Sequence, residues 1–303
     1  MPDLIWLSIV LCLIVGAAID TSNICLLRAT INLTMGNASM IIGIIVVTTS
    51  ASAVYYLNTE FSLHHRLSAW AYPTWTTLAG AALFVSGTIL NDCCAIGTVG
   101  KIARGDIGHL ATFAGALSVT WLIPPMQLDS QVPNLPLMRD LNWLIVVLTF
   151  ATVAIIVGRH HIRGQRMAPY LLLGVTAAFL TDWQGNWTWI SVFERLRFGM
   201  HSSLLALVFF AAVLLGATLT AWHRGHFKLL RPEPIKILRE VLGGGLMLAG
   251  AFLIPGANDV LSVYGVPSGS PDAVIGYLVM FVFMLTAVRI KLLISRDQAT
   301  KAQ

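Results

Sequence analysis

The sequence has few charged residues. Asp, Glu, Lys and Arg make up 11% of its 303 residues, whereas soluble globular domains contain roughly 25%. Hydrophobic residues make up 56% of the chain, and its mean hydropathy is +0.77. This composition excludes a soluble enzyme and indicates an integral membrane protein.

Motifs that would indicate other functions are also missing. The net charge is +5, but the chain has no block of roughly five to eight Lys and Arg residues, so no nucleic-acid partner is expected. No nucleotide-binding loop is present, which argues against ATP hydrolysis. The four cysteines form no CxxC pair and no zinc-binding spacing, so we predict neither a metal site nor another cofactor.

Long apolar segments recur along the whole chain. Windows of high hydropathy fall at 4–19, 38–57, 71–90, 107–125, 141–158, 168–182, 201–222, 238–255 and 272–294. Segments of this length and composition span a bilayer as helices, so we predict an all-α polytopic protein with about nine transmembrane helices. The first and sixth are short and run into polar segments, which indicates broken or re-entrant helices.

The basic residues are distributed unevenly between alternate loops. With nine spans, fifteen of the nineteen Lys and Arg residues fall on one side and four on the other. Because basic residues are enriched in cytoplasmic loops, the N-terminus is predicted outside and the C-terminus in the cytoplasm.

The two halves of the chain have a similar order of segments. A short span ends at Asp20 in the first half and at Asp182 in the second. Cys94 lies 74 positions after Asp20 and Ala257 lies 75 positions after Asp182, so the two halves pair Cys94 with Ala257 with a shift of one residue. We therefore predict a first transmembrane repeat at 1–125, a linker with a central helix at 126–166, and a second, inverted repeat at 167–303. The alternative is chance similarity between apolar segments.

The end of the first span contains candidate site residues. Thr21, Ser22 and Asn23 are common at helix N-termini, so a new helix is predicted to begin here with Cys25 in its first turns. A thiol at this position lies in the positive potential of the helix N-terminus. The alternative is that Cys25 is a small buried apolar residue.

A second group of polar and small residues follows the third span. Cys93 and Cys94 precede Gly97 and Thr98, and the glycines at 97, 100 and 105 disfavour a plain helix. We therefore predict a re-entrant turn that lines a cavity. The two thiols are expected to be free, because a disulfide between adjacent cysteines is strained.

Three patterns suggest a family. G-x-x-x-D-x-x-x-x-C at 16–25, L-x-x-x-C-x-x-G-T at 90–98 and I-P-G-A-N-D-V-L-S-V-Y-G-V-P-S-G-S-P-D-A-V-I-G-Y-L at 254–278 resemble the YeeE/YedE sulphur-transport family. The resemblance implies a bacterial inner-membrane permease that imports thiosulfate or a related anion by passing it between cysteine thiols. It implies that Cys25 is the first of these cysteines and Cys94 the second.

The chain departs from the family pattern at two places. Asp92 and Cys93 stand where the family usually has two glycines, and the second repeat has Gly256, Ala257 and Asn258 where thiosulfate-transporting members have a further cysteine. The substrate is therefore open among thiosulfate, other sulfur anions and selenium analogues. The residues expected along the pathway are Ser22, Asn23, Cys25, Cys93, Cys94, Gly97, Thr98, Gly256 and Asn258.

Neutral thiols suit such a substrate physically. An S–H group donates weakly to a large, soft anion, which allows the anion to bind and then to leave. The expected partners are the sulfur-containing anion and the lipid bilayer, with a cytoplasmic sulfur-carrier protein as a further candidate, and no catalysis is expected. The alternative function is a membrane thiol or persulfide oxidoreductase that uses the Cys93–Cys94 pair.

Overall fold

The computed structural model is built from helices. It describes residues 2–60, 73–122, 151, 158, 164–185, 187–196, 200–254 and 256–301. Within these residues there is no strand, apart from an isolated bridge between Asp106 and Leu230. The all-α fold predicted from the sequence is confirmed.

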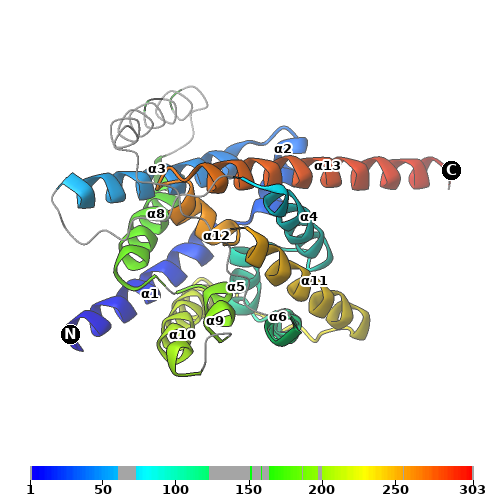
Figure 1. The fold of residues 1–303 in the computed structure, drawn as a ribbon. Coiled ribbons are helices and arrows are strands. Elements are labelled where there is room, and N and C mark those ends of the chain that lie inside the picture. Colours follow the sequence, from blue (N-terminus) through cyan, green and yellow to red (C-terminus); the bar gives the residue numbers. More distant parts are fainter. Residues whose placement is uncertain are drawn as a thin grey trace.

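The helices of the two halves follow the same order (Figure 1). The first half contains α1 (Pro2–Ser22), α2 (Leu26–Thr34), α3 (Ser39–Glu60), α4 (Trp75–Leu90), α5 (Ala95–Ala103), η1 (Ile107–His109) and α6 (Leu110–Leu122). The second contains α8 (Gly164–Gln184), α9 (Trp189–Leu196), α10 (Met200–His223), α11 (Pro234–Leu253), α12 (Asn258–Val260), the π-helix η2 (Leu261–Gly265) and α13 (Pro271–Lys301).

Several helices are long and apolar enough to cross a membrane. In the described part of the chain five pass this test, at Ile5–Thr34, Ser39–Asn58, Trp75–Ala103, Leu204–His223 and Pro271–Ile294. A sixth candidate joins Pro234–Leu253 to Asn258–Gly265 across a 50° bend. These spans confirm a multi-pass membrane protein. The predicted span 141–158 lies outside the described residues except for positions 151 and 158.

Both predicted breaks in the first half are present, but their local structure differs from the prediction. α1 continues through Ser22, and the hydroxyls of Thr21 and Ser22 bond back to carbonyls of α1 instead of capping the next helix. The N-cap of α2 is Cys25 itself. The prediction of a helix N-terminus at 20–23 was therefore wrong by a few residues, because serine and threonine also bond to their own preceding turn.

The second break also lies earlier than the glycines suggested. The chain turns at Asn91–Asp92, where Asp92 has a φ of 55°, and α5 begins directly after Cys94. Gly97 and Gly100 lie inside α5, so they do not break the helix. The expectation of a turn over the glycines was wrong, since Gly97 is required for close packing rather than for turning, as described below.

The two halves match in detail at their breaks. Three residues after Asp20, Asn23 has a φ of 51°, and three residues after Asp182, Gly185 has a φ of 71°. Cys94 and Ala257, the N-caps of α5 and α12, have nearly the same backbone angles, with φ of −80° and −86° and ψ of 179° in both. The backbone thus repeats the register inferred from the sequence.

Matching helices also exchange their packing partners. α1 packs against α10 while α3 packs against α8, and α4 lies against its own counterpart α11. Such an exchange is expected for two repeats related by a two-fold axis. The ends of the repeats at 125 and 167 remain a prediction.

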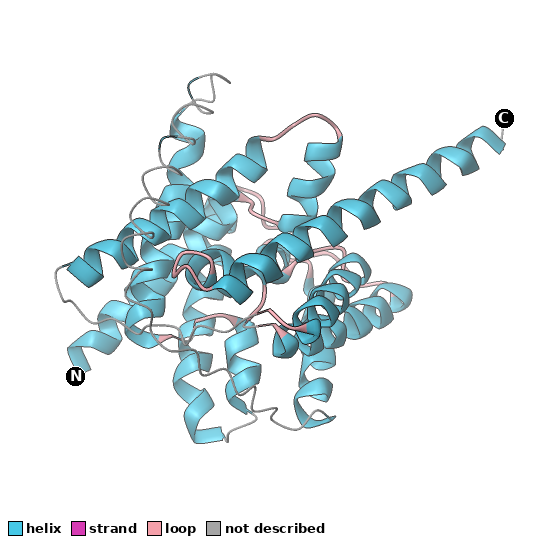
Figure 2. Ribbon diagram, turned by 45° about the horizontal axis from the view of Figure 1, so that its top comes forward, coloured by secondary structure: helices cyan, strands magenta, loops and turns pink. Residues whose placement is uncertain are grey.

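Small residues bring α4 and α11 close together. A Cβ on Gly87 would lie 2.6 Å from the Gly243 carbonyl oxygen, and one on Gly250 would lie 2.5 Å from the Phe84 nitrogen. Larger residues would therefore separate these helices, as in other membrane helix pairs. α13, in contrast, extends at its C-terminal end beyond the other helices (Figure 2).

Candidate substrate pathway

The two breaks of the first half bring two cysteines together. The Leu26 N–H, directly after Cys25, donates to Cys94 Sγ at 3.3 Å. Both side chains are buried, with 6% of Cys25 and none of Cys94 exposed. Since Cys25 and Cys94 cap α2 and α5, each thiol lies at the start of a helix.

Gly97 allows this approach. A Cβ at this position would lie 2.9 Å from Cys25 Sγ and 3.1 Å from Cys93 Cβ, closer than side-chain atoms pack without displacement. One residue on, the Thr98 hydroxyl donates to the Cys94 carbonyl oxygen at 3.1 Å. Gly97 thus keeps the space beside the Cys25 thiol open.

A cavity of about 130 Å³ opens beside these thiols. Cys25, Cys93 and Gly97 line it, and so do four charged residues. Those charged residues are Arg28, Asp92, Lys101 and Arg104. With three cations and one carboxylate, the cavity has a positive potential that favours an anion.

Asn23 links two of the cations. Its side-chain oxygen accepts hydrogen bonds from Arg28 at 2.8 Å and from Arg104 at 2.7 Å. Arg104 also pairs with Asp20 at 2.8 Å, whereas no carboxylate of the described residues forms an ion pair with Arg28 or Lys101. The positive charge available to a ligand therefore comes mainly from Arg28 and Lys101.

Asp20 itself is fully buried and joins three helix ends. Arg104 at the end of α5 and Arg224 just after α10 both bond to its carboxylate, at 2.8 and 3.1 Å, and to its carbonyl oxygen. The aspartate of the predicted motif thus fixes the end of α1 and does not line the cavity.

The other residues predicted from the sequence lie farther from the cavity. Ser22 bonds to the Ile19 carbonyl oxygen and accepts a bond from the Tyr170 hydroxyl on its own carbonyl oxygen, and it does not line the cavity. Asn258 is buried, and within the described residues its side-chain oxygen has no hydrogen-bond partner. Gly256 has a φ of 108° and forms the turn before α12.

The second half places aromatic residues where the first half has its thiol. Trp187 lies five residues after Asp182, as Cys25 lies five residues after Asp20. Trp187, Trp189 and Asp259 line a second cavity of only about 10 Å³, and Trp189 donates from Nε1 to the Ala95 carbonyl oxygen at 3.1 Å. This side of α5 is therefore almost filled.

Comparison with known proteins bears on this arrangement. Residues 141–286 match the family described as sulphur transport. Over these residues the chain is similar to the sulphur-transport family. The resemblance seen in the sequence is confirmed, and a role in sulphur transport is supported. No curated protein matches the chain.

The sulphur-transport match covers the second half of the protein, so the cysteines lie outside it. It includes the 254–278 pattern but neither 16–25 nor 90–98. The assignment of Cys25 and Cys94 to the pathway therefore depends on the repeat and on the cavity, not on the family match.

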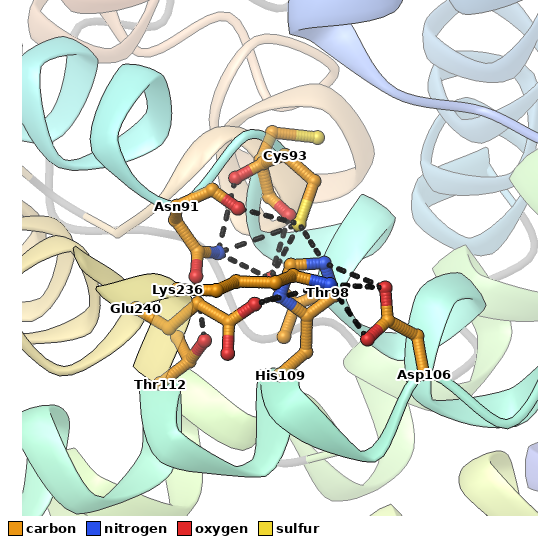
Figure 3. Close-up of polar contacts among 9 residues, drawn as sticks. Asn91, Cys93, Thr98, Asp106, His109, Thr112, Lys236 and Glu240 are labelled. Carbon is orange, nitrogen blue, oxygen red and sulfur yellow. Dashed lines mark hydrogen bonds and ion pairs between the residues drawn. The ribbon is translucent and has the colours of Figure 1, made fainter. Parts of the chain in front are cut away.

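The structure also contains a buried polar cluster that the sequence analysis did not identify (Figure 3). Cys93 Sγ lies 3.8 Å from His109 Nε2, and His109 Nδ1 lies 2.7 Å from Glu240 Oε1. Lys236 Nζ lies 2.7 Å from Asp106 and 3.6 Å from Glu240. Glu240 and His109 fall inside predicted spans, and an ionisable residue within a span was the available signal.

Asp106, His109 and Glu240 have the side chains of a metal site. Their donor atoms lie within 4.8 Å of one another and all three residues are buried. The Lys236 ammonium, however, lies against both carboxylates. We therefore interpret the group as a protein ion network in which lysine is the cation.

Proposed function

We propose that this protein is a bacterial inner-membrane permease that imports thiosulfate or a related sulfur or selenium anion. The N-terminus lies outside and the C-terminus in the cytoplasm, as the distribution of basic residues predicts. The observation that carries the proposal is that Cys25 lines the cationic cavity and that the next residue, Leu26, donates its N–H to Cys94 Sγ at 3.3 Å. The match of residues 141–286 to the sulphur-transport family supports the same substrate class.

The cavity has the properties that capture of an anion requires. Arg28 and Lys101 raise the local concentration of anions. A dianion that leaves water loses hydration that the protein must replace. Thiol S–H groups and the N–H groups at the starts of α2 and α5 replace part of it. Because thiols donate weakly, the anion is held loosely enough to move on.

In the proposed path the anion passes from one cysteine to the next. Cys25 faces the cavity, while Cys94 lies behind it and does not line the cavity. Asn258 supplies amide N–H donors on the side of the second repeat, where a third thiol is missing. Cys93, Gly97 and Thr98 shape the passage beside them.

Ile19 lines both the cationic cavity and the small cavity beside Trp187. In the proposed path it lies between them and closes the passage. An apolar side chain at this position blocks an anion and its water. Transport then requires a movement of one repeat against the other.

The geometry of the Cys93–Cys94 pair does not favour the alternative of a thiol oxidoreductase. The Cys93 thiol contacts Asn91, Thr98 and His109, whereas the Cys94 thiol accepts from the Leu26 N–H. The adjacent cysteines thus direct their thiols to different partners and do not act as a pair.

Uptake of labelled anions into proteoliposomes tests the proposal. Wild-type protein should take up ³⁵S-thiosulfate, and Cys25→Ala should lower the rate by tenfold or more. Cys12→Ala is the matched control, because Cys12 is a buried cysteine of α1 that does not line the cavity, and it should retain uptake. If thiosulfate, sulfite, sulfide and selenium analogues all fail to enter, the proposed function is wrong.

A further inference from the structure

The segment that joins α10 to α11 is basic and exposed. Residues 222–239 contain five Lys and Arg residues and one acidic residue, Glu233. All of these positions are exposed except Pro232 and Lys236, which are partly buried. No residue of the segment lines the cationic cavity, so the proposed pathway does not account for its charge.

Three of the five cations have no carboxylate partner. The other two, Arg224 and Lys236, form ion pairs with buried aspartates. Lys228, Arg231 and Arg239 form no ion pair with any other described residue. Positive charge that no protein carboxylate neutralises attracts anions from outside the protein.

Large apolar side chains lie between these cations. Trp222 is 70% exposed, Leu229 is 64% exposed and Ile235 is 73% exposed. The Trp222 ring also stacks on that of Phe227, with the ring centroids 6.2 Å apart. A small soluble anion needs no such surface, whereas aromatic and aliphatic side chains beside Lys and Arg are typical of segments at a membrane interface.

The start of α11 places both kinds of side chain on one face. Ile235, Leu238, Arg239 and Leu242 have the spacing i, i+3, i+4 and i+7, and all four are exposed. Residues with this spacing share one face of a helix. The apolar members of this face suit the acyl chains, and the long Arg239 side chain reaches from there to the headgroups.

The loop between the two helices stays close to the membrane surface. Ten residues, 224–233, separate the end of α10 from the start of α11. A chain of this length that leaves and returns reaches at most about 17 Å from the helix ends. Both helices contribute to candidate membrane spans, so the loop lies near the level of the lipid headgroups.

Backbone hydrogen bonds hold this loop in place. The Lys228 N–H donates to the Arg104 carbonyl oxygen at 2.9 Å, and the Leu230 N–H donates to that of Gly105 at 3.0 Å. Gly105 has a φ of 94°, and a Cβ there would lie 2.5 Å from the Lys228 carbonyl oxygen. Because the backbone is already ordered, a ligand binds it without the entropic cost of ordering a loop.

We propose that residues 222–239 bind the phosphate groups of anionic phospholipids. Lys228, Arg231 and Arg239 pair with the headgroups, and the exposed apolar side chains between them pack against the acyl chains. In the orientation proposed above, these lipids belong to the cytoplasmic leaflet, which carries negative charge. The proposal does not depend on which anion the protein transports.

Lipid retention measured by native mass spectrometry tests this proposal. Wild-type protein is reconstituted in an equal mixture of phosphatidylglycerol and phosphatidylcholine and then extracted with detergent. It should retain phosphatidylglycerol in an excess of tenfold or more. The double variant Arg231→Gln, Arg239→Gln should retain the two lipids in nearly equal amounts, because each cation near an anionic surface contributes about fivefold to attachment.

The matched control is the double variant Arg231→Lys, Arg239→Lys. It keeps both charges, so its excess of phosphatidylglycerol should stay within about threefold of the wild type. Both double variants change exposed side chains that have no ion-pair partner among the described residues, so the fold should be preserved. Elution as a single peak in size-exclusion chromatography checks this.

Three results would overturn the proposal. An unchanged excess of phosphatidylglycerol in the glutamine variant would show that these cations do not bind lipid, and the surface would then suit an acidic protein instead. Loss of the excess in the lysine variant as well would exclude binding through charge. Displacement of phosphatidylglycerol by inorganic phosphate would identify a simple anion site. None of these measurements involves transport, so the proposed function is tested separately.

Discussion

The break in the first repeat and the break in the second have the same backbone but different side chains. Cys94 and Ala257 cap their helices with almost identical angles, yet one carries a thiol and the other a methyl group. Cys25 corresponds to Trp187, and Gly97 corresponds to Val260. The scaffold is therefore symmetric while the chemistry is concentrated in one half.

The flanks of the two breaks show the same contrast. Each motif aspartate is buried and bonded to a residue near the end of a helix that packs nearby, Asp20 to Arg224 after α10 and Asp182 to Asn58 in α3. The first break, however, faces a cationic cavity of about 130 Å³, whereas indole rings fill the space at the second. Breaks with a similar backbone thus do not require similar side-chain chemistry.

Gly97→Val should have the largest effect on uptake. It places at position 97 the residue type found at the corresponding position of the second break, Val260. The added atoms would occupy the space 2.9 Å from Cys25 Sγ, and overpacking a tight site displaces its neighbours. Uptake of labelled thiosulfate should fall by about a hundredfold, roughly 2.7 kcal/mol in the barrier. Val260→Gly is the matched control, and a similar loss in that variant would mean that the two breaks contribute equally.

Cys94→Ala makes the N-cap of α5 the same residue type as the N-cap of α12, Ala257. The loss of one donor from a narrow passage should reduce uptake by tenfold or more, about 1.4 kcal/mol, with the protein level unchanged. Initial uptake rates, normalised to the amount of protein reconstituted, measure this effect. Normal uptake would exclude Cys94 from the pathway.

Arg28→Gln tests the difference in charge. Arg28 lines the cavity and has no ion-pair partner in the described part of the chain, so it should contribute to capture of the anion rather than to its passage. The KM for thiosulfate should rise about threefold at low ionic strength, and the difference should shrink in salt. A change in maximal rate alone would place Arg28 elsewhere in the cycle.

Ala257→Cys introduces a thiol into the second repeat and should have the smallest effect. The backbone already matches that of Cys94, so the substitution should be tolerated and uptake should change by less than about threefold. Competition between thiosulfate and selenium analogues measures any change of preference. A complete loss of uptake would show that this position must stay small.

The sequence predicted the helices and the places where they break. Apolar windows located α1, α3 and α4 to within a few residues, because length and hydropathy determine a membrane span. Local patterns were less reliable at the breaks themselves. Ser22 belongs to the end of α1, and Gly97 lies inside α5, since both residue types have more than one structural use.

The long-range features were not predictable from local pattern. From the sequence, Arg28, Lys101 and Arg104 were interpreted only as basic residues of cytoplasmic loops. The fold places all three around one cavity. His109 and Glu240 are 131 residues apart and meet only because η1 packs against α11. Such pairs depend on how helices pack, which a single sequence does not specify.

The buried carboxylate of Asp20 constrains how this protein can move. It forms ion pairs with Arg104 at the end of α5 and with Arg224 just after α10. These contacts link the ends of α1, α5 and α10. A local movement of the Cys25 loop that displaced Asp20 would break the ion pairs with Arg104 and Arg224. We therefore expect the ends of α1, α5 and α10 to move together when the pathway opens.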